Sequence, residues 1–468
     1  MFSGKNIVAL VSFLLCTLHA LSQVSKQIIF TPEAFIQQIK LYHPIAKQAN
    51  ILVDKATAEI LSARGGFDPF INVDASRKTF DGKNYYYYTN PELRLPTPIG
   101  IDIKTGMENN GGNFLTQEST KGKTSYLGIE IPLARGLLMD KRRSVLQQAK
   151  LFRSQSEQER LAVLNDLLFD AYTDYWRWAG AYQLYSIYSK YVDIANIRLR
   201  LVRIAYRNGD RAMIDTIEAF TQVQNYQLQQ SDALLKLNNS KFDLSNYLWL
   251  PNDNPYQLPE QFAPDTIQFA MRVAPQQLDA LIDQSAKQNP AVKSYEFKLN
   301  SLAVERKLKF QGLLPSLNLS ANLLNRDYYV LKGFDALLLQ NNYKWGIEFK
   351  LPLFLREGRG EYKKIQLKIT ETELELVRKR WQIENKIRSY YNENFLLEQQ
   401  LQTTQSVYNN YSTLLRNEEL KFVQGESSLF LINTRETKVL ELLQKQVELR
   451  IKYFVSKYAI EWAAGLLR

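Results

Sequence analysis

The clearest pattern of hydrophobic and polar positions lies near the middle of the second half of the chain. From Tyr343 to Leu351 every odd position is large and apolar, and every even position is charged or glycine. This period of two predicts a β-strand with one apolar and one polar face. After Pro352 the period changes to spacings of three and four, which predict a helix with a coiled-coil seam formed by Ile383, Ile387, Tyr390, Asn394, Leu397, Leu401, Thr404, Tyr408, Tyr411 and Leu415. A helix from Arg356 to Val423 would be about 100 Å long at about 1.5 Å per residue.

Similar elements are predicted along the rest of the chain. Thr31-Pro32 is a good helix start, and the helical pattern continues to about Arg64 with a break at Pro44. Three more segments alternate like strands, at 69–76, 127–133 and 317–323. Helical spacing returns from about Leu137 to Arg207, and after a turn at residues 208–210 a further helix runs to about Leu248.

The chain repeats this order of elements. Pro44 returns as Pro290, and Pro69, Asn72 and Ala75 return as Pro315, Asn318 and Ala321, always 246 positions later. The order of helix, strand, loop, strand, long helix, turn and helix therefore occurs twice, which indicates internal duplication. We divide the chain into a signal segment at 1–22, a first repeat at 23–250, a proline-rich linker at 251–274 and a second repeat at 275–468.

Residues 81–123 connect the two strands of the first repeat and are rich in Gly, Asn, Thr and Tyr. This stretch is interpreted either as additional strands or as an extracellular hairpin. Its run of four tyrosines, Tyr85 to Tyr88, fits an aromatic girdle at a membrane interface or an ordinary aromatic strand or loop. The sequence does not choose between these alternatives.

Composition narrows the classes of function. The net charge is +11, but Lys and Arg alternate with Asp and Glu along the helices, which is typical of solvated helix faces and not of a nucleic-acid groove. The mean hydropathy is −0.32, and after residue 22 no apolar run reaches 18 residues, so a transmembrane helix in the mature chain is not expected.

The N-terminus has the features of a secretory signal peptide. Lys5 precedes an apolar core at 7–18, and small residues at 20–22 suit cleavage before Gln23. Cys16, the only cysteine, lies within this segment, and Leu15 before it does not fit a lipoprotein signal. The mature chain is therefore expected to keep His43 as its only histidine and to have no cysteine. This argues against Ser-His-Asp and Cys-His catalysis, against thiolate or multi-His metal sites, and for a protein that is no enzyme and needs no cofactor.

The predicted strands match a tilted membrane crossing, because they have about nine residues and one apolar face. Four strands do not close a barrel, and open strand edges are not tolerated in lipid, so several copies of the chain would have to share one barrel. The long helices would then project from it, and their length suits a periplasmic span. The alternative is a structural coiled-coil protein of the envelope, which explains the helical seam but neither the signal peptide nor the apolar strand faces.

These features resemble the family of TolC-like outer membrane efflux proteins. The resemblance is carried by the repeated His-Pro and Asn-Pro at Pro44 and Pro290, by the strand-to-helix passages 128–133 and 346–353, and by two aromatic-x-x-Gly turns. The resemblance implies a mainly α fold with a transmembrane β part, in which a homotrimer forms a twelve-stranded β-barrel continued by a long periplasmic α-helical barrel. It further implies the outer membrane of a Gram-negative bacterium as location, and a periplasmic adaptor (membrane fusion protein) and an inner-membrane pump as partners.

The resemblance also suggests site residues. The helical-hairpin tips, candidates for closing the duct and docking the adaptor, contain Tyr206, Gly209, Asp210, Phe422, Gly425 and Glu426. Aperture candidates are Asp215 and Glu218 of the first repeat and Leu431 and Thr434 at the positions where the family tends to have acids, so an acidic ring and a partly apolar constriction both stay open. Alternatively, Asp215 and Glu218 form a solvated helix face, and Tyr206 and Phe422 merely pack the hairpins. Lipid-facing candidates are Ile71, Val73, Leu127, Ile129, Ile131, Leu317, Leu319, Trp345, Ile347 and Phe349.

The function implied is a passive exit duct for drugs and other toxic small molecules. A duct for type I protein secretion would have a similar sequence pattern, so the cargo stays open. The scarcity of His and Met argues weakly against soft-metal transport.

Overall fold

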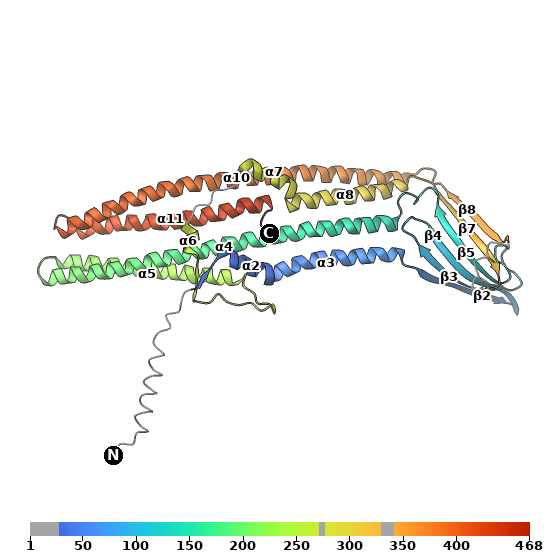
Figure 1. Cartoon of the computed structure of the whole chain (residues 1–468), viewed down its shortest axis with the longest axis horizontal. Coiled ribbons are helices and arrows are strands. Elements are labelled where there is room, and N and C mark those ends of the chain that lie inside the picture. Colours follow the sequence, from blue (N-terminus) through green and yellow to red (C-terminus); the bar gives the residue numbers. More distant parts are fainter. Residues whose placement is uncertain (1–27, 271–276, 329–340) are drawn as a thin grey trace, which may run out of the picture. The chain divides into compact units, whose positions relative to one another are not determined.

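The computed structural model describes residues 28–270, 277–328 and 341–468 (Figure 1). The predicted signal segment, with Lys5, Cys16 and His19, lies outside the described residues, as do residues 271–274 of the predicted linker. The first part of the chain contains β1 (Ile28–Phe30), α2 (Pro32–Tyr42), α3 (Pro44–Arg64), the short 3-10 helix η1 (Gly65–Phe67), β2 (Phe70–Phe80), β3 (Lys83–Pro96), β4 (Asp102–Gly111), β5 (Gly122–Pro132), α4 (Lys141–Arg207) and α5 (Met213–Ser245). The second part contains β6 (Phe262–Pro264), α6 (Thr266–Ala270), α7 (Leu278–Gln288), α8 (Pro290–Gln311), β7 (Ser316–Arg326), β8 (Tyr343–Lys350), α10 (Arg356–Val423) and α11 (Leu429–Ala464).

The predicted duplication is visible in this order. A helix beginning at a proline precedes the strands in both repeats, and a very long helix, a turn and a shorter helix follow them. The helix predicted over Arg356–Val423 has these bounds and 68 residues. Its counterpart α4 begins at Lys141 and not at Leu137 as predicted. None of the helices that the structure describes combines the length and the hydrophobicity needed to cross a membrane.

Local sequence explains where several helices begin. Thr31 lies just before α2 and its Oγ1 accepts a hydrogen bond from the backbone N–H of Ala34, with Pro32 in the first turn as predicted. Asn289 caps α8 in the same way by accepting from the N–H of Ala291. At the equivalent position of the first repeat, the Nδ1 atom of His43 accepts from the N–H of Ile45 at 3.2 Å. His43 is 7% exposed, so its role here is that of a buried helix cap.

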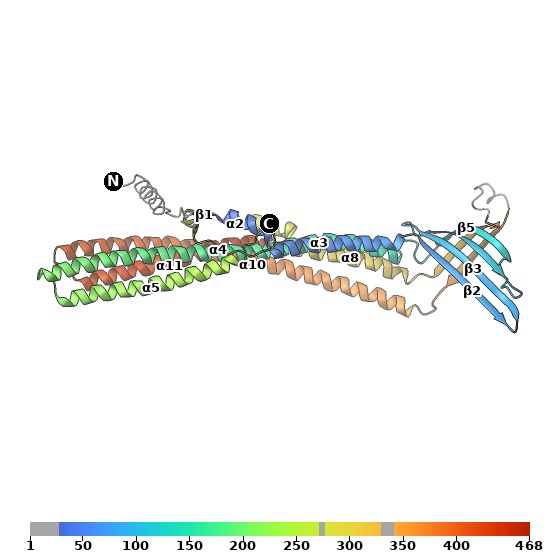
Figure 2. The same ribbon diagram turned by 90° about the horizontal axis from the view of Figure 1, so that it is seen from below.

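The described chain divides into two compact units. One of them consists of residues 50–161 and 287–382 and contains the main β-sheet. The sheet is entirely antiparallel, in the order β2-β3-β4-β5-β7-β8 (Figures 1 and 2). It has six strands where the sequence analysis counted four, because residues 81–123, whose structure the sequence left open, form β3 and β4 as two additional strands.

The other unit consists of residues up to 49, 162–286 and 383–468, and it contains α5, α11 and the corresponding parts of α4 and α10 (Figure 1). Its largest core cluster is rich in aromatic residues. The Trp176 ring stacks on Phe454 with centroids 4.0 Å apart, and Tyr172 stacks on Tyr458 at 3.8 Å. Such pairs add about 0.5–1.5 kcal/mol each beyond their buried area, so they hold α4 firmly against α11.

Members of the predicted seam of α10 are buried where it passes through the same unit, in the aromatic cluster and in a second one around Ile387. Ile387 is fully buried and Leu397 is 7% exposed. Asn394, the polar member of the seam, is also buried, and its Nδ2 donates to the carbonyl oxygen of Tyr453 and to Ser456 Oγ on α11. A polar group at such a position fixes the register of two packed helices.

The described residues of the linker predicted at 251–274 contain secondary structure. Within it, β6 pairs in parallel with β1, and α6 follows. The Tyr175 Oη atom donates to the carbonyl oxygen of Phe30 at 2.7 Å, so this small sheet is attached to α4. The start of the first repeat and the segment between the two repeats are thus joined to each other and to α4.

Candidate functional site

Two candidate sites follow from the fold, one in each unit. In the helical unit, the α4–α5 and α10–α11 turns have the same backbone structure. Gly209 and Gly425 have φ angles of 83° and 82°, a left-handed conformation that glycine adopts without steric cost. The N–H of Asp210 donates to the carbonyl oxygen of Ala205, and that of Glu426 to Lys421, which is the Schellman ending of a helix. The aromatic-x-x-Gly motif is therefore a local signal that ends both helices.

Arg211 connects the two turns. Its Nη2 donates to the carbonyl oxygen of Phe422 at 3.2 Å, and its guanidinium carbon lies 4.1 Å from the centroid of the Phe422 ring. A cation over an aromatic face at this distance is attractive. Phe422 is thus half-buried beneath Arg211, whereas Tyr206, its counterpart in the first repeat, is 43% exposed. The sequence analysis did not select Arg211, because nothing local to it points to a partner so distant in the chain.

The aperture candidates lie on α5 and α11 just beyond the turns. The Oε1 atom of Glu218 accepts a hydrogen bond from Asn433 Nδ2 at 3.0 Å, so this carboxylate is attached to the other hairpin. Asp215 is half-buried in the first turn of α5. Leu431 is 42% exposed, and the Thr434 hydroxyl donates to the carbonyl oxygen of Phe430 at 2.8 Å. Glu218 and Thr434 line the same shallow groove between α5 and α11, together with Thr221, Gln222, Phe430, Asn433, Thr437, Lys438 and Glu441.

A buried ion pair joins the helices of both hairpins. The Nη1 and Nη2 atoms of Arg198 (α4) bind the two carboxylate oxygens of Glu436 (α11) at 2.6 and 3.0 Å. Tyr226 (α5) donates to the same carboxylate at 2.9 Å, and Glu419 (α10) lies 3.6 Å from Arg198. Burial works against the charge of Arg198, but the hydrogen bonds to Glu436 and its charge raise the pKa of Arg198 above its ordinary value. Burial raises the pKa of Glu419.

In the other unit, the sheet separates apolar and polar side chains. Apart from the end of the β2–β3 pair beyond Lys78, where the register shifts, odd-numbered residues lie opposite odd-numbered residues, as in Ile71 with Leu93 and Ile129 with Ala321. All residues that the sequence analysis selected as lipid-facing are odd-numbered and therefore share one face. Many of them are exposed, such as Ile71 at 72%, Trp345 at 63% and Phe349 at 63%. Exposed apolar surface on this scale is rare in soluble proteins and indicates an apolar partner or a membrane.

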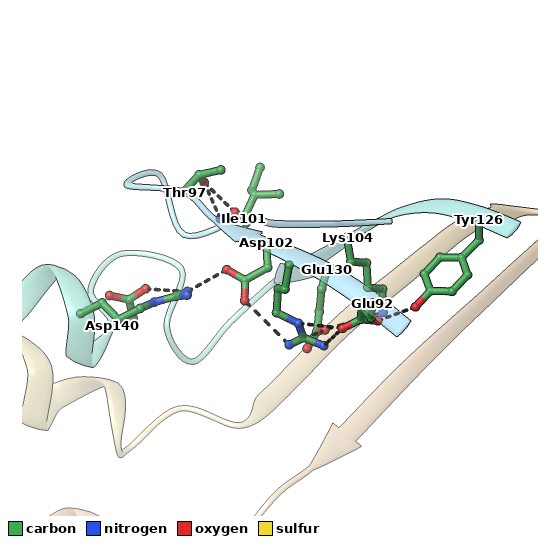
Figure 3. A network of polar contacts seen from close by, with 10 residues as sticks. Glu92, Thr97, Ile101, Asp102, Lys104, Tyr126, Glu130 and Asp140 are labelled. Carbon is green, nitrogen blue, oxygen red and sulfur yellow. Dashed lines mark hydrogen bonds and ion pairs between the residues drawn. The ribbon is translucent and has the colours of Figure 1, made fainter. Parts of the chain in front are cut away.

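The opposite face contains a network of charged side chains (Figure 3). Arg94 lies between Glu92 at 3.2 Å and Glu130 at 3.6 Å, and Lys104 is 3.8 Å from Glu130. The network continues to the start of α4, because Asp102 binds Arg142 at 2.9 Å, and Arg142 also contacts Asp140. In the middle of the sheet the Tyr126 Oη donates to Glu92 at 2.6 Å. Four acids and three bases meet in this network, so most of its charges offset one another.

Comparisons with known proteins agree with this arrangement. Residues 35–248 match the sequence model of a family described as outer membrane efflux protein. This match covers 214 of the 468 residues and shows that this part of the chain is similar to the outer membrane efflux proteins. No curated protein sequence matches the chain significantly.

Solved structures of similar fold extend the likeness to both repeats. CusC has a TM-score of 0.65 and 13% identity, covering 95% of this chain and 95% of its own. The MtrE outer membrane channel of Neisseria gonorrhoeae, solved in an open state, has a TM-score of 0.65 and 12% sequence identity. The match covers 93% of this chain and 89% of MtrE. The CmeC outer membrane channel of Campylobacter jejuni has a TM-score of 0.62 and 16% sequence identity. The match covers 93% of this chain and 86% of CmeC. The resemblance to the outer membrane efflux proteins is therefore confirmed, as is the coarse fold class of long helices combined with a β part, whereas the homotrimer and its twelve-stranded barrel stay predictions.

The structure brings some of the predicted site residues together and adds others. Phe422 meets Arg211 across the two turns, and Glu218 meets Asn433, whereas Tyr206, Asp210 and Glu426 are exposed at the turns. Sequence reasoning missed the Arg198–Glu436 pair and the charged network of the sheet. The sequence did contain a signal for that network. Charged residues occupy even positions around 92–104 and alternate with apolar residues at odd positions: Glu92, Arg94, Asp102 and Lys104 against Leu93, Leu95 and Ile103.

Proposed function

We propose that this protein is the outer membrane duct of a tripartite export system, through which small toxic molecules leave the cell passively. The observation that carries the proposal is the sheet, in which one face is apolar and largely exposed while the other is polar and charged. Such a sheet suits a wall between lipid and a water-filled lumen. The family description as efflux proteins supports small molecules as cargo, with protein secretion as the alternative.

The proposed assembly is a homotrimer. Among the described strands, β2 and β8 each pair on one side only, so the sheet ends in two open edges. Unpaired backbone groups cost several kcal/mol each in hydrocarbon, so a membrane sheet needs closure. The edge strands of neighbouring copies provide it. The open edges do not fix the number of copies in the ring. The choice of three copies rests on the resemblance to the outer membrane efflux proteins.

The helical unit is assigned to the periplasm, where its turns would close the duct and contact an adaptor attached to an inner-membrane pump. Exposed Tyr206, Asp210 and Glu426 are available for that contact, whereas Phe422 is engaged with Arg211. For the aperture, Asp215 and Glu218 would each contribute three carboxylates in a trimer, beside Leu431 and Thr434. A ring of acids at a constriction favours cations.

Single-channel recording tests the proposal. Detergent-extracted protein, inserted into a planar bilayer, should give stable unitary current steps, because the polar face encloses water. If trimeric, folded protein stays silent both as wild type and with the turns weakened by Gly209→Ala and Gly425→Ala, the duct is refuted. In that case the structural coiled-coil interpretation is correct.

An experiment in cells tests the cargo. Loss of the protein should increase the sensitivity of the cells to small toxic compounds. If sensitivity is unchanged and a secreted protein is lost from the medium instead, the secretion alternative is favoured.

Variants of α5 test the aperture. Asp215→Ala with Glu218→Ala should raise unitary conductance and reduce cation preference, since the carboxylates and the link to Asn433 are lost. Asp232→Ala provides a matched control, because Asp232 is an exposed acid on the same helix, farther from the turn. Equal conductance and selectivity in all three proteins would assign Asp215 and Glu218 to a solvated helix face.

A further inference from the structure

At 92–95 and 102–105 the inserted strands β3 and β4 continue the two-faced pattern of the sheet. On the apolar face, Leu93 lies between Ile71 and Thr105, and Ile103 lies between Leu95 and Ile129. On the polar face, Lys104 lies between Arg94 and Gly128. A surface hairpin in water would have no reason to continue both faces in register with its neighbours.

Both inserted strands are long enough to cross a bilayer. β3 has 14 residues and β4 has 10, while a tilted transmembrane strand needs about 9–11. The strands flanking them, β2 and β5, have 11 residues each. The insertion also consists of one strand in each direction, so β5 still returns the chain to the side on which α4 begins.

Side-chain packing fixes the hairpin between β2 and β5. The Tyr126 ring of β5 covers Gly106 of β4 so closely that a Cβ atom there would lie 2.6 Å from its Oη. The Tyr87 ring of β3 covers Gly111 of β4 in the same way. Arg94 on β3 reaches across β4 to Glu130 on β5 at 3.6 Å. These contacts hold β3, β4 and β5 together in this order.

We propose that each copy of this chain contributes six strands to the shared barrel, so that a trimer closes with 18 strands instead of twelve. Three copies of a six-stranded sheet give this number, and the closing contact is β8 of one copy against β2 of the next. The two edges run in opposite directions, as an antiparallel contact requires. The proposal rests on the trimeric duct proposed above and specifies its wall.

The additional strands change the size and the lining of the pore. With strands about 4.8 Å apart and tilted by about 40°, 18 strands give a backbone diameter of about 36 Å, against about 24 Å for twelve. Barrels of 16–18 strands enclose an aqueous channel. Within this wider lumen, β3 and β4 place Glu92, Arg94, Lys104 and Glu108 of every copy on the inner wall.

Spin labels on paired positions test the proposal in lipid vesicles. In a Cys16→Ser background, Thr105→Cys and Lys104→Cys place a label on either face of β4, and Ala321→Cys and Asn322→Cys do the same on β7, which belongs to the predicted strands. If β4 is part of the wall, the label at 105 should collide with oxygen dissolved in lipid as strongly as the label at 321. The label at 104 should collide with an aqueous nickel chelate as strongly as the label at 322.

The outcomes separate the two proposals. If positions 321 and 322 differ as expected but both labels on β4 meet only the nickel chelate, the hairpin lies outside the wall and the 18-stranded barrel is overturned, while the duct stands. If all four positions meet the aqueous reagent, the sheet is not in the membrane and both proposals fail. Electron cryomicroscopy of the trimer then counts the strands directly, with 18 supporting the inference and twelve overturning it.

Discussion

Glu436→Ala tests the packing between the two helical hairpins most directly. Glu436 is 2% exposed, and its carboxylate binds both terminal nitrogens of Arg198 and the hydroxyl of Tyr226. The substitution leaves a buried cation whose remaining acidic neighbour is Glu419 at 3.6 Å. Removing one partner of a buried ion pair costs about 3–5 kcal/mol, and the contact with Glu419 places the expected loss near about 3 kcal/mol.

Native-state hydrogen exchange measures this loss locally, since amides report the free energy of the opening that exposes them. A loss of about 3 kcal/mol corresponds to roughly 150-fold faster exchange, because 1.4 kcal/mol is a factor of ten. We expect this acceleration for the amides of α4 and α11 around Arg198 and Glu436. Amides of the sheet, which belongs to the other compact unit, serve as an internal reference.

The matched control removes both charges, as Arg198→Met with Glu436→Leu. Replacing a buried pair by apolar side chains of similar volume is often neutral or stabilising, so exchange should return close to the wild-type rate. The reasoning is refuted if Glu436→Ala accelerates exchange less than about threefold. It is equally refuted if the double variant exchanges as fast as the single one, because volume and not charge would then matter.

Two further predictions concern the turns. Gly209→Ala and Gly425→Ala should each destabilise their turn by about 1–2 kcal/mol, because a Cβ is unfavourable at a φ near +80°. Gly209→Asn and Gly425→Asn should lose less stability, because Asn tolerates this conformation better. The rate of limited proteolysis at the turns measures the loss in all four variants. Hydrogen bonds from Ser427 and then Arg435 lower the pKa of Glu418, so the charged carboxylate stabilises the α10–α11 turn above the ordinary pKa of a glutamate. This stabilisation should disappear as the pH falls through the lowered pKa, below about pH 4. Hydrogen exchange of the turn, corrected for its intrinsic pH dependence, should then accelerate in a step in the wild-type protein. The Glu418→Gln variant should show no such step. A step of equal size in that variant would contradict the assignment.

Elements governed by local rules could be predicted from the sequence. The helix Arg356–Val423 was placed correctly, because its seam repeats over many turns and Pro352 excludes an earlier start. The cap at Thr31 and the glycine turns were likewise readable, since each depends on a few consecutive residues. The duplication then supplied the order of elements in both halves.

The number of strands in the sheet could not be predicted in the same way. The stretch 81–123 is rich in Tyr, Asn, Gly and Thr, so its two faces differ little in hydrophobicity over much of its length. Whether such a stretch pairs into a sheet depends on the strands beside it, and β3 pairs with β2 on one side and β4 on the other. The strand count was therefore corrected only by the structure.

By itself, the sequence determined the signals that act over a few residues or repeat with a fixed period: the strand faces, the long helices, the turns and the duplication. Tertiary structure decided which distant residues meet. Arg198 and Glu436 are 238 positions apart, and Arg211 and Phe422 are 211 apart, yet each pair is in direct contact. The physical reason is that a charge or a ring in a helix acquires its partner only when another helix packs against it, and no local pattern records which helix that is.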